Sequence, residues 1–151
     1  MIVFGYTLSD AFGRVLNTVK VMDGEEPCAV YSFSREEEYE TVFGCPQEEC
    51  RAVISREDLE KIKRLAADER LYETETLEGP YEVVILDGFM QEFEFSSGSR
   101  HILASGSNIQ ACRGDDVHCP HSVLMINMLK EAEQILVSLG VSKECFRLSI
   151  T

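Results

Sequence analysis

Apolar residues in the first third of the chain follow a pattern typical of β-strands. Residues 2–8 and 14–22 are rich in β-branched and aromatic side chains, and residues 9–13 between them predict a hairpin loop. Residues 28–33 predict a third strand, and residues 41–43 predict a short strand before Gly and Pro interrupt the pattern. This part of the chain therefore predicts consecutive β-strands with no helix between them.

Two later segments repeat their apolar residues at helical spacing. Residues 55–70 carry a narrow apolar stripe, with Ser55 as the predicted N-cap and Asp58 in a capping-box position. The second segment has a broader apolar arc, with Pro120 in its first turn and Gly140 just beyond its end. We expect this second helix to be the central one packed on the sheet.

The region between the two helices predicts a three-stranded meander. Residues 81–86 and 89–95 flank Asp87 and Gly88, a dipeptide favoured by two-residue hairpin turns. Residues 100–105 then predict the third strand of the meander.

The order of these elements predicts the fold class. Runs of strands are broken by two isolated helices, whereas a parallel sheet would need strands and helices to alternate. Residues 146–150 alternate apolar and polar side chains and predict an edge strand. A length of 151 residues with 44% hydrophobic and 27% charged residues suits one domain. We therefore expect a single α+β domain over residues 1–151, with a mainly antiparallel sheet of five to seven strands packed on two helices.

Charge narrows the choice of partners. The chain holds 14 Lys and Arg against 27 Asp and Glu, which gives a net charge of −13. Such a chain repels nucleic acid and anionic membrane surfaces. The acids concentrate in residues 21–50, with nine acids and one base, and in residues 71–99, with seven acids and no base. If these stretches are neighbours across the sheet, they form an acidic surface for a basic protein or a cation; otherwise the acids serve solubility.

The sequence also indicates a compartment. No basic segment followed by a long apolar run opens the chain, and no apolar run approaches the length of a membrane span. We therefore expect a cytoplasmic protein, in which the six cysteines are free thiols or metal ligands instead of disulfides.

The densest group of reactive side chains lies in residues 112–121. Cys112, His118, Cys119 and His121 are candidate zinc ligands, because thiolate and imidazole are the groups that zinc prefers. The spacing matches no standard zinc motif, and adjacent His118 and Cys119 cannot easily both reach one ion. The alternative is an ordinary surface loop.

Cys119 has a second interpretation, because it precedes the Pro120 that is expected to begin the last helix. A thiol at a helix N-terminus can have its pKa lowered towards the thiolate, and His118 or His121 could then serve as its base. The alternative is an inert, partly buried cysteine.

Several short motifs carry a family resemblance. Leu-Asp-Gly at 86–88, Gly-Ser-Asn at 106–108 and the helix led by Pro120 resemble, over about residues 55–140, a group of small uncharacterised bacterial proteins. The chain departs from them in having Phe89 where they tend to carry Trp, and in an insertion at residues 112–119. The resemblance implies a small α+β domain and brings no known activity.

The common nucleotide-binding and hydrolase signatures are absent from the sequence. A role in turns explains Asp87 and Asn108 more simply than a role in catalysis does. We therefore expect an acidic binding or protein-interaction module without catalytic activity, with a basic protein or a small ligand as partner. A zinc or reactive-thiol protein centred on residues 112–121 is the alternative. The Phe12 loop and the C-terminal strand are the candidate edges of a homodimer.

Overall fold

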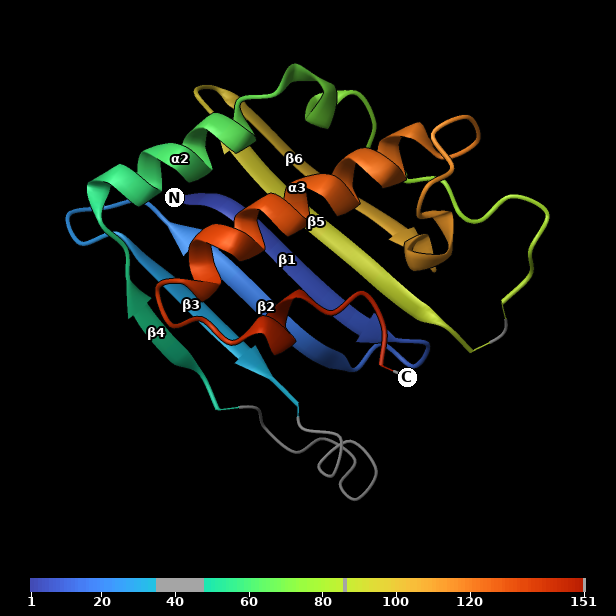
Figure 1. The fold of residues 1–151 in the computed structure, drawn as a ribbon, viewed down its shortest axis with the longest axis horizontal. Helices are drawn as coiled ribbons and strands as arrows, with labels where there is room; N and C mark the ends of the chain where they lie inside the picture. The colour runs from blue at the N-terminus through green and yellow to red at the C-terminus, as the bar shows by residue number, and fades with distance from the viewer. Residues whose placement is uncertain (35–47, 86, 151) are drawn as a thin grey trace.

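One six-stranded antiparallel sheet forms the frame of the molecule in the computed structural model, which describes residues 1–34, 48–85 and 87–150 (Figure 1). The strand order across the sheet is β4-β3-β2-β1-β5-β6. The strands are β1 (Ile2–Asp10), β2 (Val15–Met22), β3 (Cys28–Phe33), β4 (Cys50–Val53), β5 (Phe89–Ser97) and β6 (Arg100–Ser107). The predicted hairpin and third strand at the N-terminus are confirmed.

Both α-helices lie on the same face of this sheet and contact each other (Figure 1). They are α2 (Arg56–Ala66) and α3 (Pro120–Val137), and the short 3-10 helices are η1 (Glu69–Tyr72), η2 (Ile109–Cys112) and η3 (Lys143–Phe146). The prediction of one α+β domain with an antiparallel sheet and two helices is confirmed. Within the described residues, neither helix combines the length and apolar character that crossing a membrane requires.

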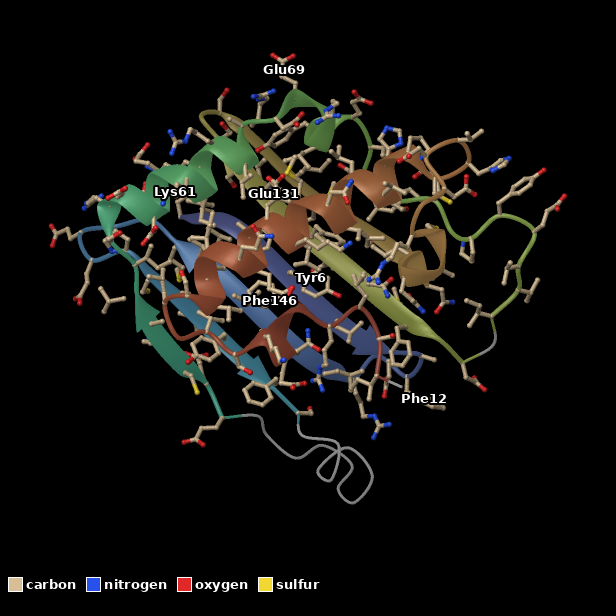
Figure 2. All side chains as sticks on the ribbon, viewed as in Figure 1. Tyr6, Phe12, Lys61, Glu69, Glu131 and Phe146 are labelled. Atoms are coloured by element: carbon tan, nitrogen blue, oxygen red, sulfur yellow. The ribbon has the colours of Figure 1, made fainter. Side chains whose placement is uncertain are left out.

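The core lies between the helices and one face of the sheet. Because side chains alternate along a strand, Phe4, Tyr6 and Leu8 of β1 all point to this face and are fully buried. Tyr6 pairs in register with Phe93 of β5, and their ring centroids are 4.9 Å apart. Figure 2 labels Tyr6 and Phe146, which lie beside α3 over the sheet. Burial of these large apolar side chains stabilises the domain.

The ends of the helices follow their local sequence signals. The Ser55 hydroxyl accepts a hydrogen bond from the backbone N–H of Asp58, as the capping pattern predicts. The helix ends at Ala66, earlier than predicted, because Asp68 caps the separate turn η1 with its own side chain. At the other helix, Pro120 occupies the first turn and Gly140 adopts a left-handed φ of 105° beyond the end.

The predicted strand over residues 81–86 is wrong for its described part, because residues 81–85 form no strand. The side of β5 where this strand was expected is occupied by β1. Residues 75–77 instead make a short parallel contact with β6, with Leu77 N–H donating to the Ser105 carbonyl at 2.8 Å and Ser105 N–H donating to the Glu75 carbonyl at 2.9 Å. The predicted meander is therefore reduced to the β5–β6 hairpin.

The predicted hairpin turn at Asp87 and Gly88 is consequently wrong as well. Asn108 holds the start of β5: its side-chain oxygen accepts from Phe89 N–H and its own N–H donates to the Phe89 carbonyl, both at 2.8 Å. A Cβ on Gly88 would lie 1.8 Å from that Asn108 oxygen. The glycine is needed for a close approach and not for a hairpin.

The predicted edge strand over residues 146–150 is wrong too, because this segment crosses the helix-covered face of the sheet. Three strand side chains bind its backbone carbonyls: Asn17 binds Cys145, Tyr6 binds Arg147 and Gln91 binds Leu148, at 2.6 to 2.9 Å. Its alternating pattern serves to bury Phe146 and Leu148. The sequence analysis also missed β4, and the strand predicted over residues 41–43 lies outside the described residues.

Candidate functional site

The four predicted zinc ligands lie at one end of the molecule, where α3 begins beside the connection from η1 to β5. Cys112 ends η2, and Cys119 is the residue immediately before α3. Residues 73–80 of the connection run alongside both, and we call them the strap. The strap, η2 and the first turn of α3 together form the candidate site.

A buried amide fixes η2 in this place. Gln91 of β5 is fully buried, and its side-chain oxygen accepts a hydrogen bond from Ile109 N–H at 3.2 Å. Its amide nitrogen donates to Gln110 and to the Leu148 carbonyl, each at 2.7 Å. Because a buried amide without partners would be costly, these bonds lock the chain that leads to Cys112.

Glu78 of the strap caps α3. One oxygen of its carboxylate accepts the backbone N–H groups of His121 and Ser122, both at 2.9 Å. The Ser122 hydroxyl in turn donates to the Glu78 carbonyl at 2.6 Å. A carboxylate is the most favourable partner for these N–H groups, because they carry the positive end of the helix dipole. The side chain of Cys119, the residue at the N-cap position, makes no capping bond.

His121 lies between two carboxylates of the strap. Its Nδ1 is 2.6 Å from Glu78 and its Nε2 is 3.0 Å from Glu73. Hydrogen bonding to Glu78, and then to Glu73, raises the pKa of His121. Partial burial pushes the pKa of Glu78 upwards, but hydrogen bonds from Ser122 and His121 outweigh it and leave that pKa lowered. The charged forms of His121 and Glu78 therefore stabilise each other.

The thiols of Cys112 and Cys119 contact the backbone of the strap. Cys112 Sγ donates to the Glu78 carbonyl at 3.4 Å, and Cys119 Sγ donates to the Gly79 carbonyl at 3.3 Å. Both side chains are buried, and with Val123 they form a small apolar cluster. Burial, followed by the neighbouring Cys119, raises the pKa of Cys112 to about 12. A thiol with such a pKa is almost entirely protonated near neutral pH.

His118 points away from this cluster. Its Nδ1 is 3.1 Å from the Asp115 carboxylate, and its ring stacks on Tyr81 with centroids 3.6 Å apart. The structure thus brings Cys112 and Cys119 together, places His121 against the strap, and leaves His118 on an exposed loop. Within residues 1–34, 48–85 and 87–150, no group of three or more His, Cys, Asp or Glu side chains is arranged to hold a metal ion. The five described cysteines are free thiols.

Glu73, Glu78 and Tyr81 are the site residues that sequence analysis missed. Each lies about 40 residues before its partner in the chain, so no local spacing connects them. The available signal was the acidic character of residues 71–99, which predicted a charged surface without specifying a partner.

Beside the strap, several apolar side chains lie in water. Val84 is 88% exposed, Val117 83%, Val83 55% and Tyr81 53%. The Tyr81–His118 stack joins their two loops, and we call these four side chains the end patch. The loop that carries three of them projects beyond the sheet at the right of Figure 1. Glu82 in this loop has a left-handed φ of 55°, which is uncommon for a residue with a side chain.

The described parts of the two acidic stretches do not form one surface across the sheet. β3 and β4 lie at one edge and β5 near the other, with β2 and β1 between them. In the first stretch, Asp23 is paired with Lys63 at 2.8 Å. Residues 73–87 hold five acids and no base, and these acids lie in the strap and in the loop that follows it.

No protein-family model matches the chain, and no curated protein matches it. The resemblance over residues 55–140 to small bacterial proteins stays a prediction.

Proposed function

We propose that this chain is a cytoplasmic, non-catalytic interaction module that binds a basic partner protein at the end patch. The observation that carries the proposal is the exposure of Tyr81, Val83 and Val84 on one loop, which the Tyr81–His118 stack joins to the loop that exposes Val117. Exposed apolar side chains that gather in one place, surrounded by polar groups, are typical of a protein-binding site.

The charge around the patch favours a basic partner. Glu82 and Asp87 are exposed on the same loop, and Asp116 is exposed next to Val117. Such a field attracts a Lys- or Arg-rich surface and accelerates its encounter, while the apolar side chains provide the buried contact. A small apolar ligand would be expected to occupy an enclosed pocket instead.

The backbone of the patch is also available for hydrogen bonds with a partner. Beyond a turn at Tyr81 and Glu82, no described residue forms a backbone hydrogen bond with Val84 or Ile85. Residues 83–85 all have β-forming side chains, so a partner can pair with their backbone as well as bury the two valines.

A photo-crosslinking experiment tests the proposal. A benzophenone side chain is placed at position 84, at position 117, or at the control position 61 on α2, and the protein is irradiated in an extract of the organism that encodes it. We expect positions 84 and 117, but not 61, to yield the same adduct with a protein of pI above about 9. The yield should fall as salt screens the acidic field.

Competition with unlabelled variants supplies the control. Unlabelled wild-type protein and Val137→Ser should suppress the adduct equally, whereas Val84→Ser should suppress it far less, because only Val84 belongs to the patch. An acidic partner, equal labelling from position 61, or no adduct at all would each overturn the proposal.

A zinc or reactive-thiol role for residues 112–121 is the alternative. Cys112 and Cys119 lie side by side, which favours it, but their thiols bind strap carbonyls and both His121 nitrogens bind carboxylates. An ion would have to displace these partners. The interaction module is therefore the better supported proposal.

A further inference from the structure

The face of the sheet opposite the helices carries a second set of exposed apolar residues. Both helices and the C-terminal segment lie on the other face, and no described helix covers this one (Figure 1). Val15, Met90 and Leu103 point to it and are each about half exposed. We call it the open face.

The registers of the strands give the open face an ordered pattern on either side of β1. Gly5 of β1 pairs with Lys20 of β2 on one side and with Glu94 of β5 on the other. One strand further out, Lys20 pairs with Val30 and Glu94 pairs with Leu103. The row therefore reads apolar, basic, glycine, acidic, apolar.

A second row on this face, four residues further along β1, has an apolar residue on either side of a small one and no charges. Ser9 of β1 pairs with Val15 of β2 on one side and with Met90 of β5 on the other. Between the two rows, Thr7 pairs with Thr18 and with Glu92. The residues of β1 itself are small along this line, which leaves room for another surface to approach.

This pattern is self-complementary under a two-fold rotation. An axis that runs along β1 between two copies places β2 of one copy over β5 of the other. Lys20 then faces the partner's Glu94, Val30 faces the partner's Leu103, and Val15 faces the partner's Met90. Each contact occurs twice, as in every isologous interface. Two sheets that face each other pack about 10 Å apart with nearly aligned strands, which preserves this correspondence near the axis.

We propose that the open face is the interface of a homodimer, in which two sheets pack face to face about β1 and Lys20 of each copy pairs with Glu94 of the other. The open face suits a second copy because its own charges nearly balance, with Lys20 and Arg51 against Glu92 and Glu94, in a chain of net charge −13. Charge repulsion between copies is therefore small at this surface. The Glu94 carboxylate also lies 2.7 Å from His101 of its own chain, which orients it on this face.

The test is the mass in solution, measured by light scattering and sedimentation from about 5 to about 500 µM, a range that covers micromolar dimers. Wild-type protein should reach twice the 17.0 kDa of one chain. Lys20→Glu and Glu94→Lys should each raise the dimer Kd by about 100-fold, because each creates two like-charge contacts across the interface.

Mixing the two variants provides the decisive measurement. A heterodimer of Lys20→Glu with Glu94→Lys regains opposite charges at both contacts, so the mixture should dimerise within about tenfold of wild type. Rescue by mixing cannot come from a variant that fails to fold. Lys61→Glu and Glu131→Lys on the helices, labelled in Figure 2, change net charge equally and should leave the Kd unchanged.

Each other outcome overturns the proposal. A wild-type chain that stays monomeric at about 500 µM forms no such dimer. A dimer that responds equally to Lys20→Glu and Lys61→Glu uses a different surface. Two variants that stay monomeric when mixed would show that Lys20 and Glu94 do not face each other.

Discussion

Individual residues in this protein act through close contacts that a linear sequence does not display. Gly88 and Asn108 are the clearest case, since the amide of one residue fills the space that a side chain on the other would need. Asn108 itself has a left-handed φ of 58°, so its backbone and its side chain both serve to start β5. Asp-Gly at 87–88 therefore has the composition of a hairpin turn, but its glycine serves to leave room for the Asn108 amide.

Gly88→Ala should lower the free energy of unfolding by about 2 to 3 kcal/mol, because the Asn108 amide must move and Phe89 N–H loses its acceptor. Urea denaturation measures this loss. Gly24→Ala is the matched control, since a Cβ there meets no atom within 4 Å. Combining Gly88→Ala with Asn108→Gly should cost less than the sum of the two single changes, and strict additivity would contradict the contact.

At the scale of elements, α3 depends on a segment far from it in sequence. The strap supplies the carboxylate that caps the helix, and the thiols of Cys112 and Cys119 hold the strap carbonyls in return. His121 closes the arrangement by bridging two carboxylates of the strap. The strap and the helix N-terminus therefore stabilise each other.

The raised pKa of His121 makes this stabilisation depend on pH. Its contribution is complete below the unfolded value of about 6.5 and is lost as pH rises through the higher folded value. His121→Gln should therefore lower the melting temperature by about 2 to 4 °C at pH 6, about 1 kcal/mol, and by progressively less at alkaline pH.

Thermal melts from about pH 5.5 to about pH 9.5 measure the effect. Glu75→Gln is the control on the same segment, because Glu75 is exposed and its side chain makes no contact with His121. A difference between wild type and His121→Gln that stays constant over this range would contradict the role given to His121.

The whole molecule has two surfaces of different character. The end patch combines exposed valines with acids, whereas the open face is nearly neutral and repeats about β1. The sequence predicted one acidic surface only if its two acidic stretches were neighbours across the sheet, and the sheet order separates their described parts. A basic partner and a second copy can therefore occupy different parts of the molecule.

Folding of the whole molecule should not depend on a metal ion. The core between sheet and helices is continuous, and Cys112, Cys119 and His121 already have protein partners. We expect excess EDTA to change the melting temperature by less than about 1 °C and native mass spectrometry of protein made without a metal-binding tag to give the metal-free mass. A lower melting temperature together with a lost zinc mass would favour the zinc alternative.

Sequence signals between neighbouring residues correctly predicted the elements whose structure depends on those residues alone. The first three strands, the Ser55 cap and the Pro120 start of the last helix were predictable, because alternation and capping act between residues close in sequence. The same signals failed for residues 81–85, whose composition favours a strand but whose expected place beside β5 is taken by β1. Composition can favour a strand, but the strand forms only where another strand still has an unpaired edge.

The sequence by itself therefore determined the fold class, the acidic charge and the cluster of Cys and His in residues 112–121. Only the tertiary structure decided that Glu78 caps α3, that His118 leaves the cluster, and that Lys20 and Glu94 flank Gly5 across three strands. The physical reason is the range of the interactions. Backbone preferences and amphipathic periodicity act within a few residues, whereas a cap or a row of side chains across a sheet joins residues that only the folded chain brings together.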